Sequence, residues 1–277
     1  MSLRINTNTS AINAYNNLTA NQGTMEKAME KLSSGLRINR AADDASGLAI
    51  SQGLTSQING LTQAVSNAND GINVAQIADG AMNTQQNILQ RMNTLAVQAA
   101  NGTQDASSLS AINSEITALN SQLDNISATT AFGGVKLLNG SAGTSGAIQF
   151  QVGATSVSSD QITLSLSATD SSSLGTSGIN ITDQASALSA IDTISGALSQ
   201  LSTDRAGLGA TQNQLQYTVT NLQNTIQNVT AARSNITDAD LATEVTKMTQ
   251  AQILSQAATS MLAQANSAPQ SVLKLLQ

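Results

Sequence analysis

The charged side chains able to do chemistry in this chain are carboxylates and basic groups. The 277 residues include 17 aspartates and glutamates and 11 lysines and arginines, but no cysteine and no histidine. Thiolate nucleophiles, the usual zinc ligands and an imidazole for proton transfer near neutral pH are therefore excluded. Carboxylates can still bind calcium or act as acid and base, but they are scattered and no constellation supports catalysis. We expect no enzyme, no metal site and no cofactor.

One cluster of charged residues has an informative spacing. Arg40 stands three and four positions before Asp43 and Asp44, within ion-pair reach if this segment is helical. Alternatively, Asp43 or Asp44 caps the helix that follows by accepting hydrogen bonds from its first free amides. An exposed ion pair contributes only about 0–1 kcal/mol. The cap is therefore the more economical interpretation.

The overall charge and hydropathy exclude further classes of protein. A formal net charge of −6 argues against nonspecific binding of nucleic acid, which requires Lys and Arg to neutralise phosphates. No stretch approaches the roughly 18 apolar residues of a membrane span. The first residues, Met1 to Asn6, also lack the layout of a cleaved secretory signal. On these grounds alone, we expect a cytosolic protein.

The composition favours long helices over a thick globular core. Pro269 is the only proline, so no proline interrupts a helix over the preceding 268 residues. Only four aromatic residues are present: Tyr15, Phe132, Phe150 and Tyr217. Burial must therefore come from aliphatic side chains and methionine, which suits thin seams between helices.

Apolar residues recur at spacings of three and four in several blocks, as in paired helices. The block over 58–99 alone would form a rod of about 60 Å, and Asn101-Gly102 is a stop signal. Further blocks cover 18–36, 109–126, 188–201, 215–236 and 241–265. An ordinary helical bundle has the same periodicity.

The region 139–180 differs from the helical blocks in composition and in the spacing of its apolar residues. It is rich in Gly, Ser and Thr, which weaken helices. Within it, Ile148, Phe150 and Val152 alternate with polar residues, and a second alternation begins at Ile162 and continues through Leu164 and Leu166. This period of two predicts a pair of half-buried strands, forming a hairpin between two helical halves.

Several long segments resemble bacterial flagellins, in family order. The segment 30–51 reads EKLSSGLRINRAADDASGLAIS and resembles the N-terminal signature of the family. The opening LRINTNTSAINAYNNL, the later ILQRMNTLAVQAANGT and SEITALNSQLDNISATTAFGGVKLLNG are similar to flagellin segments as well. So is the ending, NITDADLATEVTKMTQAQILSQAATSMLAQANSAPQSVLKLL. The resemblance covers about 1–140 and 185–277.

The resemblance implies a mainly α fold of long antiparallel helical rods formed by both chain halves, with a small β-hairpin. It implies an inner coiled coil with its spoke (D0) over 1–43 and 235–277, and a helical rod (D1) over 44–139 and 181–234. Residues 140–180 would hold the hairpin and turns, with no large outer domain. The chain thus resembles a short flagellin.

The function implied by the resemblance is that of a structural subunit that polymerises into the flagellar filament for swimming. The resemblance also implies export by the flagellar type III apparatus, which reconciles an extracellular location with the missing signal peptide. The implied partners are other copies of the chain, an export chaperone at the C-terminal region, and hook-associated and cap proteins. No nucleic acid and no membrane insertion are expected.

A physical account of assembly follows from narrow apolar stripes near both ends. Helices of this kind are marginal alone, so we hypothesise that the ends fold when neighbouring copies supply partners. An intramolecular hairpin, already stable in solution, is the alternative. The residues expected to form the filament packing are Leu3, Ile5, Leu18, Met25, Met29, Leu32, Leu254, Met261, Leu262, Val272, Leu273, Leu275 and Leu276. Residues 37–47 are the expected spoke, in which Arg37, Arg40, Asp43 and Asp44 help to orient the rods.

The resemblance also implies surfaces recognised by host innate immune receptors. The residues matching the surface bound by the animal Toll-like flagellin receptor are Gln90, Arg91, Leu95, Gln98 and Glu115. Residues 92–94 replace a more charged stretch of strongly stimulatory members. Leu95 also lies on an apolar stripe, which gives it a packing alternative. Residues 30–51 match the peptide sensed by plant receptors, with departures at Leu36, Arg40 and Ala42.

Two other non-enzymatic functions remain as alternatives to a filament subunit. A hook–filament junction protein shares the terminal helices, although the DDASGL and LAVQAAN motifs favour a filament subunit. A secreted monomeric adhesin should carry a substantial central domain, whereas the central region here is short. Unaided polymerisation of the pure protein distinguishes the filament subunit from both.

Overall fold

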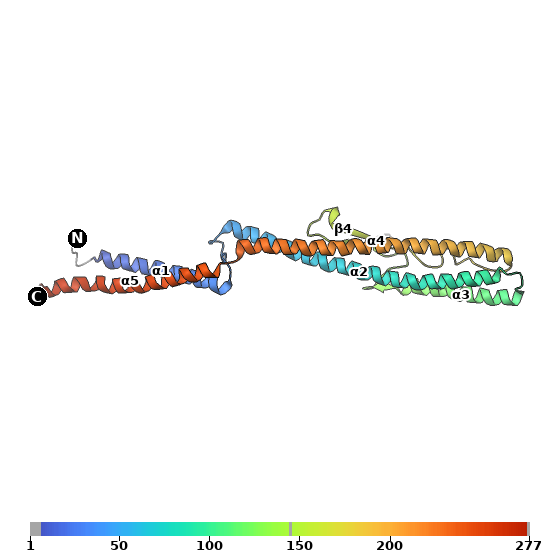
Figure 1. Cartoon of the computed structure of the whole chain (residues 1–277), viewed down its shortest axis with the longest axis horizontal. Helices are drawn as coiled ribbons and strands as arrows, with labels where there is room; N and C mark the ends of the chain where they lie inside the picture. Colours follow the sequence, from blue (N-terminus) through green and yellow to red (C-terminus); the bar gives the residue numbers. More distant parts are fainter. Residues whose placement is uncertain (1–6, 144–145, 276–277) are drawn as a thin grey trace. The chain divides into compact units, whose positions relative to one another are not determined.

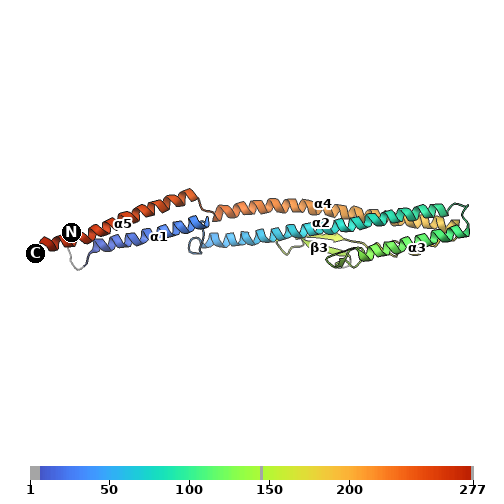
Figure 2. The same ribbon diagram turned by 90° about the horizontal axis from the view of Figure 1, so that it is seen from below.

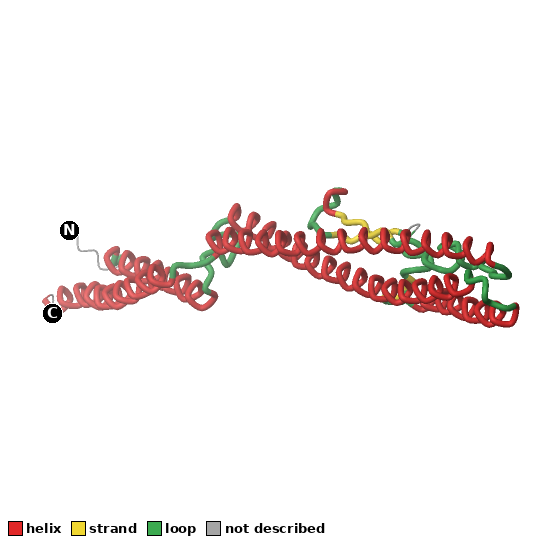
Figure 3. The backbone as a smooth tube through the Cα atoms, turned by 45° about the vertical axis from the view of Figure 1, so that its right-hand side comes forward, coloured by secondary structure: helices red, strands yellow, loops and turns green. Residues whose placement is uncertain are grey.

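The computed structural model describes the backbone of residues 7–143 and 146–275, with side chains described as far as residue 267. Figures 1 and 3 show that long helices dominate the described part. The helices are α1 (Thr9–Ser34), α2 (Ala45–Ala99), α3 (Ala106–Thr129), α4 (Gln184–Thr237) and α5 (Leu241–Leu275). The mainly α fold is confirmed. The helix expected from residue 58 begins earlier, at Ala45, and the blocks 188–201 and 215–236 belong to one helix, α4.

The chain folds into two compact units. The terminal unit comprises 1–56 and 228–277, and the central unit comprises 57–227. Helices α2 and α4 each contribute residues to both units.

In the terminal unit, α1 and α5 lie side by side and antiparallel (Figures 1 and 2). The Asn8 side chain accepts a hydrogen bond from Ala11 N–H at the start of α1 and donates to the carbonyl of Ala265 at 2.8 Å. Gly35 ends α1 in the left-handed conformation, with φ of 72°, which glycine adopts without a steric penalty. Both ends of α1 are thus fixed by local hydrogen bonding or by α5.

The seam between α1 and α5 follows the three-four alternation of a coiled coil. Its members are at least partly shielded from solvent, and they are Ala11, Ala14, Leu18, Asn21, Met25, Ala28 and Leu32 of α1 with Glu244, Met248, Ala251, Ser255, Ala258, Leu262 and Ala265 of α5. Among the described hydrophobic side chains of the two helices, only those of Ala28, Ala251 and Ala258 are fully buried. The seam is therefore thin.

The central unit has a continuous aliphatic core. Helices α2, α3 and α4 contribute Leu89, Met92, Ile116, Leu123 and Leu201, which are 0% exposed. Leu137, Leu138, Leu164 and Ile181, from strands and extended segments, complete the same cluster. The apolar stripes of the three helices therefore meet around one interior.

The predicted hairpin is confirmed. Strands β3 (Ala147–Gln151) and β4 (Gln161–Ser165) pair antiparallel, with Ile148 opposite Leu164 and Phe150 opposite Ile162. A 3₁₀ turn, η1 (Ser158–Asp160), precedes β4. The strands pack on the helices because Val152 and Ile162 join Leu215 and other residues of α2 and α4 in a second buried cluster. The Asn67 side chain of α2 also donates to the carbonyl of Gln151 at 2.9 Å.

A second, smaller strand pair was not expected from the sequence. Strands β1 (Ala131–Phe132) and β2 (Val135–Lys136) pair antiparallel. Gly133 and Gly134 form the turn with φ of 56° and 87°, values that favour glycine. Two-residue strands are too short to show a period of two, so only the Gly-Gly turn was visible in the sequence.

Polar side chains of α2 and α3 fix the extended segment that leads back to α4. Asn113 both donates to the carbonyl of Ile181 and accepts from its N–H, and Asn120 donates to the carbonyl of Thr176. The buried Gln85 donates to the carbonyl of Thr169 at 3.1 Å. These bonds satisfy backbone groups that no sheet covers, so the segment keeps one path across the core.

Candidate interaction surfaces

The residues expected to pack the filament fall on two different faces of α1 and α5. Leu18, Met25, Leu32 and Leu262 are partly buried and lie on the intramolecular seam. Met29, Leu254 and Met261 point away from it, and they are 44%, 43% and 65% exposed. The structure thus divides one predicted set into an internal group and an outward group. The remaining residues lie outside the described side chains: Leu3, Ile5, Val272, Leu273, Leu275 and Leu276.

The outward face holds more apolar side chains than the sequence analysis selected. In α1, Ile12 is 51% exposed and Tyr15 is 60% exposed, and in α5 Ile253 is 60% exposed. These residues were missed because they stand off the three-four stripe, which reports the intramolecular seam. Contiguous exposed apolar patches are a common feature of interaction surfaces.

The connector between α1 and α2 is hydrogen-bonded to the connector between α4 and α5. Leu36 and Asp238 form an isolated antiparallel bridge, in which Arg37 N–H donates to the carbonyl of Thr237 at 2.7 Å. The Arg37 guanidinium donates to the carbonyl of Ile236 at 2.6 Å. Arg37 also lies 3.9 Å from the carboxylate of Asp44.

The less favoured alternative, an ion pair of Arg40 with Asp43 or Asp44, is not formed in the structure. Arg40 pairs instead with Glu30 of α1, with Nε and Oε1 2.9 Å apart, because residues 40–43 form a turn and not a helix. The capping alternative agrees with the structure for Asp44. Its carboxylate accepts from Gly47 N–H at 2.8 Å, directly before α2 begins at Ala45.

Asp43 holds the turn of the connector. Its carboxylate accepts hydrogen bonds from the backbone N–H groups of Arg40 and Asn39, at 3.0 and 3.1 Å. These two bonds stabilise the charged form and lower the pKa of Asp43 below its ordinary value. The carboxylate therefore stabilises the turn as long as it remains ionised.

The expected receptor surface on α2 and α3 is only partly a surface. Gln90, Arg91 and Gln98 are exposed, and Arg91 pairs with Glu115 of α3, with Nη2 and Oε1 2.7 Å apart. Leu95 is 2% exposed and belongs to the internal core. Its inclusion in an accessible surface is therefore corrected: Leu95 packs within the chain, as its place on the apolar stripe allows. Val97, at 56% exposed, is the neighbouring apolar side chain that does reach solvent.

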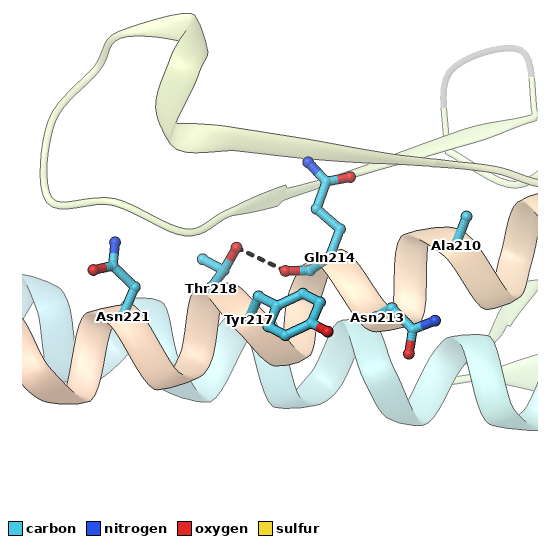
Figure 4. A pocket seen from close by; sticks show the side chains of 6 residues that line it. All are labelled: Ala210, Asn213, Gln214, Tyr217, Thr218 and Asn221. Atoms are coloured by element: carbon cyan, nitrogen blue, oxygen red, sulfur yellow. Dashed lines mark hydrogen bonds between the residues drawn. The ribbon is translucent and has the colours of Figure 1, made fainter.

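A shallow groove runs along one side of α4. Ala210, Asn213, Gln214, Tyr217, Thr218 and Asn221 line it (Figure 4). Tyr217 is 77% exposed, which is unusual for so large a ring. The sequence analysis did not select this surface. The available signal was the absence of any charged residue between Arg205 and Arg233.

The part of the chain that the structure describes contains no helix long and apolar enough to cross a membrane. Nor do three or more acidic side chains gather anywhere in that part in an arrangement that could hold a metal ion.

The comparisons with known proteins all find similarity to flagellins or other flagellar proteins. Residues 5–143 match the family model for the bacterial flagellin N-terminal helical region, and residues 191–276 match that for the C-terminal helical region. A flagellin of Halalkalibacterium halodurans is 46% identical over 275 residues, which cover 99% of each chain. A flagellin of Bacillus subtilis is 43% identical over 304 residues, covering 99% of this chain and all of the relative.

The longer relatives and the solved structures to which the chain is similar are also flagellar proteins. Flagellin B of Vibrio cholerae is 35% identical in an alignment that extends over 378 residues, against the 277 of this chain. The crystal structure of Bacillus cereus flagellin is 32% identical with a TM-score of 0.50, covering 57% of this chain and 88% of the other. The structure of a putative flagellar hook-associated protein from Vibrio parahaemolyticus, 11% identical, has a TM-score of 0.59 and covers 71% of this chain, which is a likeness of fold alone.

Proposed function

Because this chain belongs to the bacterial flagellin family and is a structural subunit of the flagellar filament, we propose that the outward face of α1 and α5 packs against other copies of the chain. The junction-protein alternative is not favoured, because relatives at 43–46% identity over the whole chain are flagellins. The proposal assigns the chain a structural role without catalysis.

One observation carries this proposal: several large side chains of the terminal helix pair face outward, while the hydrophobic residues that the pair buries most fully are alanines. Ile253 and Met261 of α5 are 60% and 65% exposed, whereas Ala251 and Ala258 on the inner side are 3% and 9% exposed. A solitary pair of helices gains more by burying the larger residues. The large exposed side chains contribute to stability only if a further partner covers the outer face and buries them.

The same observation supports coupled folding of the ends. Burial of apolar area stabilises by about 25 cal/mol per Å². The seam removes little such area, because its fully buried hydrophobic residues are alanines and its leucines and methionines are only partly buried. Ordering the backbone costs roughly 1–2 kcal/mol per residue. The α1–α5 pair is therefore marginal alone and becomes stable when copies cover Ile12, Tyr15 and Met261.

Circular dichroism of monomer and filament tests coupled folding. The pure chain is expected to polymerise when seeded, and its helical signal per residue is expected to rise on assembly. A monomer with the full helix content of the filament supports the alternative of a preformed intramolecular hairpin. A pure chain that never polymerises, even with filament fragments, contradicts the packing proposal.

Export and location form a further part of the proposal. We infer that the chain reaches the cell exterior through the flagellar type III apparatus, without a cleaved signal peptide, as the family implies. The exposed Ile253, Leu254 and Met261 need cover before assembly, which supports binding of an export chaperone to the C-terminal region. Hook-associated and cap proteins would meet the same terminal helices at the two ends of a filament.

Host recognition is retained as a narrower proposal. The exposed Gln90, Arg91 and Gln98, with the half-buried Glu115, offer an animal receptor a polar surface built around the Arg91–Glu115 ion pair. Loss of receptor signalling in Arg91→Ala, with normal melting of the protein, is the expected result. Normal signalling by that variant contradicts it. The plant-receptor match over 30–51 stays a prediction.

A further inference from the structure

The dipeptide Asn-Gly occurs three times in the chain, at residues 59–60, 101–102 and 139–140. All three copies lie in the central unit. The Cγ atom of an asparagine carboxamide is electrophilic, and the backbone nitrogen of the next residue can attack it. Glycine at that next position leaves the approach open, because it has no Cβ. Since the three dipeptides are chemically the same, the structure around each one decides how reactive it is.

The reaction in question is the conversion of asparagine to an acid without an enzyme. The glycine nitrogen loses its proton to water and forms a bond to Cγ, while the bond from Cγ to Nδ2 breaks and the amide nitrogen leaves as ammonia. The resulting succinimide ring is opened by water at either of its carbonyls, which gives aspartate or isoaspartate. Water is the co-reactant, and nothing is oxidised or reduced. The reaction requires an unpaired glycine N–H and an asparagine that can rotate.

The dipeptide at Asn101 meets these requirements. It lies in the turn that joins α2 to α3 (Figure 1), and both Asn101 and Gly102 are exposed. Within the described ranges 7–143 and 146–275, no backbone hydrogen bond has Gly102 N–H as its donor. A Cβ added at Gly102 would meet no atom within 4 Å, so the space around the attacking nitrogen is open.

The dipeptide at Asn59 is protected although its asparagine is also exposed. Asn59 and Gly60 lie inside α2, where each backbone N–H is bonded to the carbonyl four residues earlier. The segment after β3 also covers the helix here, because a Cβ added at Gly60 would lie 2.9 Å from Cβ of Ala154. The nitrogen of Gly60 becomes available only when the helix opens locally, which has a free-energy cost.

The dipeptide at Asn139 is held in place by hydrogen bonds. The Asn139 carboxamide oxygen accepts from the N–H of Ser141 at 3.1 Å and from its hydroxyl at 2.7 Å. The preceding residue, Leu138, is 0% exposed, and its carbonyl accepts from Thr169 N–H at 2.9 Å. Rotation of Asn139 toward the nitrogen of Gly140 must break the bonds to Ser141, so this site should react more slowly than Asn101.

We propose that Asn101 is a site of spontaneous deamidation, and that the fold protects Asn59 strongly and Asn139 in part. This inference does not depend on assembly into a filament, since it concerns the chemistry of one turn in the single chain. It assigns the Asn101-Gly102 dipeptide a reactivity in addition to its place at the end of α2.

Both products alter the turn. A carboxylate at residue 101 lies two positions after Ala99, the last residue of α2, where the negative end of the helix dipole disfavours it. In isoaspartate the main chain runs through the side-chain carbon, and the former backbone carbonyl becomes a free carboxylate. That carbonyl accepts from Gln104 N–H at 3.1 Å in the unmodified turn. Deamidation should therefore loosen the last turn of α2.

Ageing of the purified chain in mildly alkaline buffer tests the proposal. Samples taken over time are digested, and mass spectrometry follows the conversion of amide to acid in the peptide that contains each Asn-Gly. In the folded chain, Asn101 is expected to react at least about tenfold faster than Asn59, because the helix must open before Asn59 can react. Asn139 should fall between the two. A parallel sample in denaturant should bring the three rates together.

Two variants supply the controls. Gly102→Ala keeps Asn101 but adds a Cβ beside the attacking nitrogen, so it should slow the reaction at Asn101 by about tenfold. The substitution causes no strain, because the space is open and Gly102 is not among the glycines with positive φ. Asn101→Asp reproduces one product and should speed amide hydrogen exchange in the last turn of α2 about two- to fivefold. Asn87→Asp, which adds the same charge at an exposed position in the interior of α2, should leave that turn unchanged.

Three results would overturn the proposal. The first is a folded chain in which Asn101 reacts no faster than Asn59. The second is an equally wide spread of rates in denaturant, which would assign the difference to neighbouring residues in the sequence and not to the fold. The third is an unchanged rate in Gly102→Ala, with thermal melting showing that the variant is folded, because attack by the glycine nitrogen would then not be the step that limits the reaction.

Discussion

The two units of this chain bury different kinds of side chain. In the central unit, Leu89, Leu123 and Leu201 are 0% exposed within one cluster from three helices. In the described part of α1 and α5, the fully buried hydrophobic residues are alanines, and Met261 is 65% exposed. The first arrangement stabilises itself, whereas the second leaves several of its large side chains exposed.

The difference shows how one periodicity can serve two purposes. Full burial of a leucine contributes about 1.5–3 kcal/mol, whereas an alanine contributes far less. Both units show a three-four alternation, but the size of the residue at the buried positions differs. Size at the seam, more than the pattern, decides whether a helix pair is stable before assembly.

The largest expected effect comes from truncating the core of the central unit. Leu89→Ala should lower the free energy of unfolding of the monomer by about 2–5 kcal/mol, since it removes apolar contacts and leaves a cavity. Thermal or urea unfolding measures this loss. Met261→Ala is the counterpart in the terminal unit, where the monomer should change by no more than about 0.5 kcal/mol.

The order of the two variants should reverse when assembly is measured, with the larger effect in Met261→Ala. Met261→Ala is expected to raise the concentration of subunit needed for polymerisation, because its side chain finds partners only in the filament. A large loss of monomer stability in Met261→Ala would break the comparison, since it would mean that α5 is already packed through that face.

A glycine pair sharpens the comparison inside the terminal unit. A Cβ added at Gly47 would lie 2.7 Å from Cδ1 of Ile38 and would also meet the carboxylate of Asp44. Gly47→Ala should therefore destabilise the filament by about 1–3 kcal/mol, because Ile38 is 4% exposed and has no room to move. Melting of assembled filaments followed by circular dichroism is the measurement.

Gly53 provides the control six residues further along α2. An added Cβ there meets no atom within 4 Å, so Gly53→Ala should stabilise by about 0.5–1 kcal/mol through helix propensity. Equal melting of the two variants would show that the connector is not tightly packed. The expected contrast places the specific packing of the terminal unit at its connector and not along the thin seam between α1 and α5.

Much of the fold follows from local patterns in the sequence. The stop after Ala99 and the β3–β4 hairpin were predictable because a glycine and a period of two are local signals. The partner of Arg40 was not. Glu30 lies ten residues away on α1, and only the turn at residues 40–43 brings the two side chains together.

The candidate surfaces were harder to predict than the helices. Periodicity identifies an apolar stripe but does not say whether the stripe meets the same chain or another copy. Leu18 and Met29 were assigned to one set, yet the first is partly buried on the internal seam and the second is 44% exposed. Leu95 was likewise assigned to a surface, and its neighbours in α3 and α4 bury it. Long-range packing decides such cases.

The smallest expected effect concerns pH at the start of α5. The Asp240 carboxylate accepts from the Thr243 hydroxyl at 2.9 Å and from Ala242 N–H at 3.0 Å. The hydroxyl bond is the larger cause that lowers the pKa of Asp240 below its ordinary value of 3.8. Since the folded pKa is the lower one, the stabilisation is present above pH 3.8 and is lost as pH falls through the folded pKa.

Acidification should therefore loosen the first turn of α5 before it unfolds the central core, which depends on aliphatic contacts that do not titrate. Backbone chemical shifts of residues 241–244 across an acid titration follow this step. Asp240→Asn keeps an acceptor for the helix amides but cannot titrate, so the acid-dependent step at these residues should disappear. Persistence of the same step in Asp240→Asn would assign it to another carboxylate, and simultaneous loss of the core would erase the distinction between the two units.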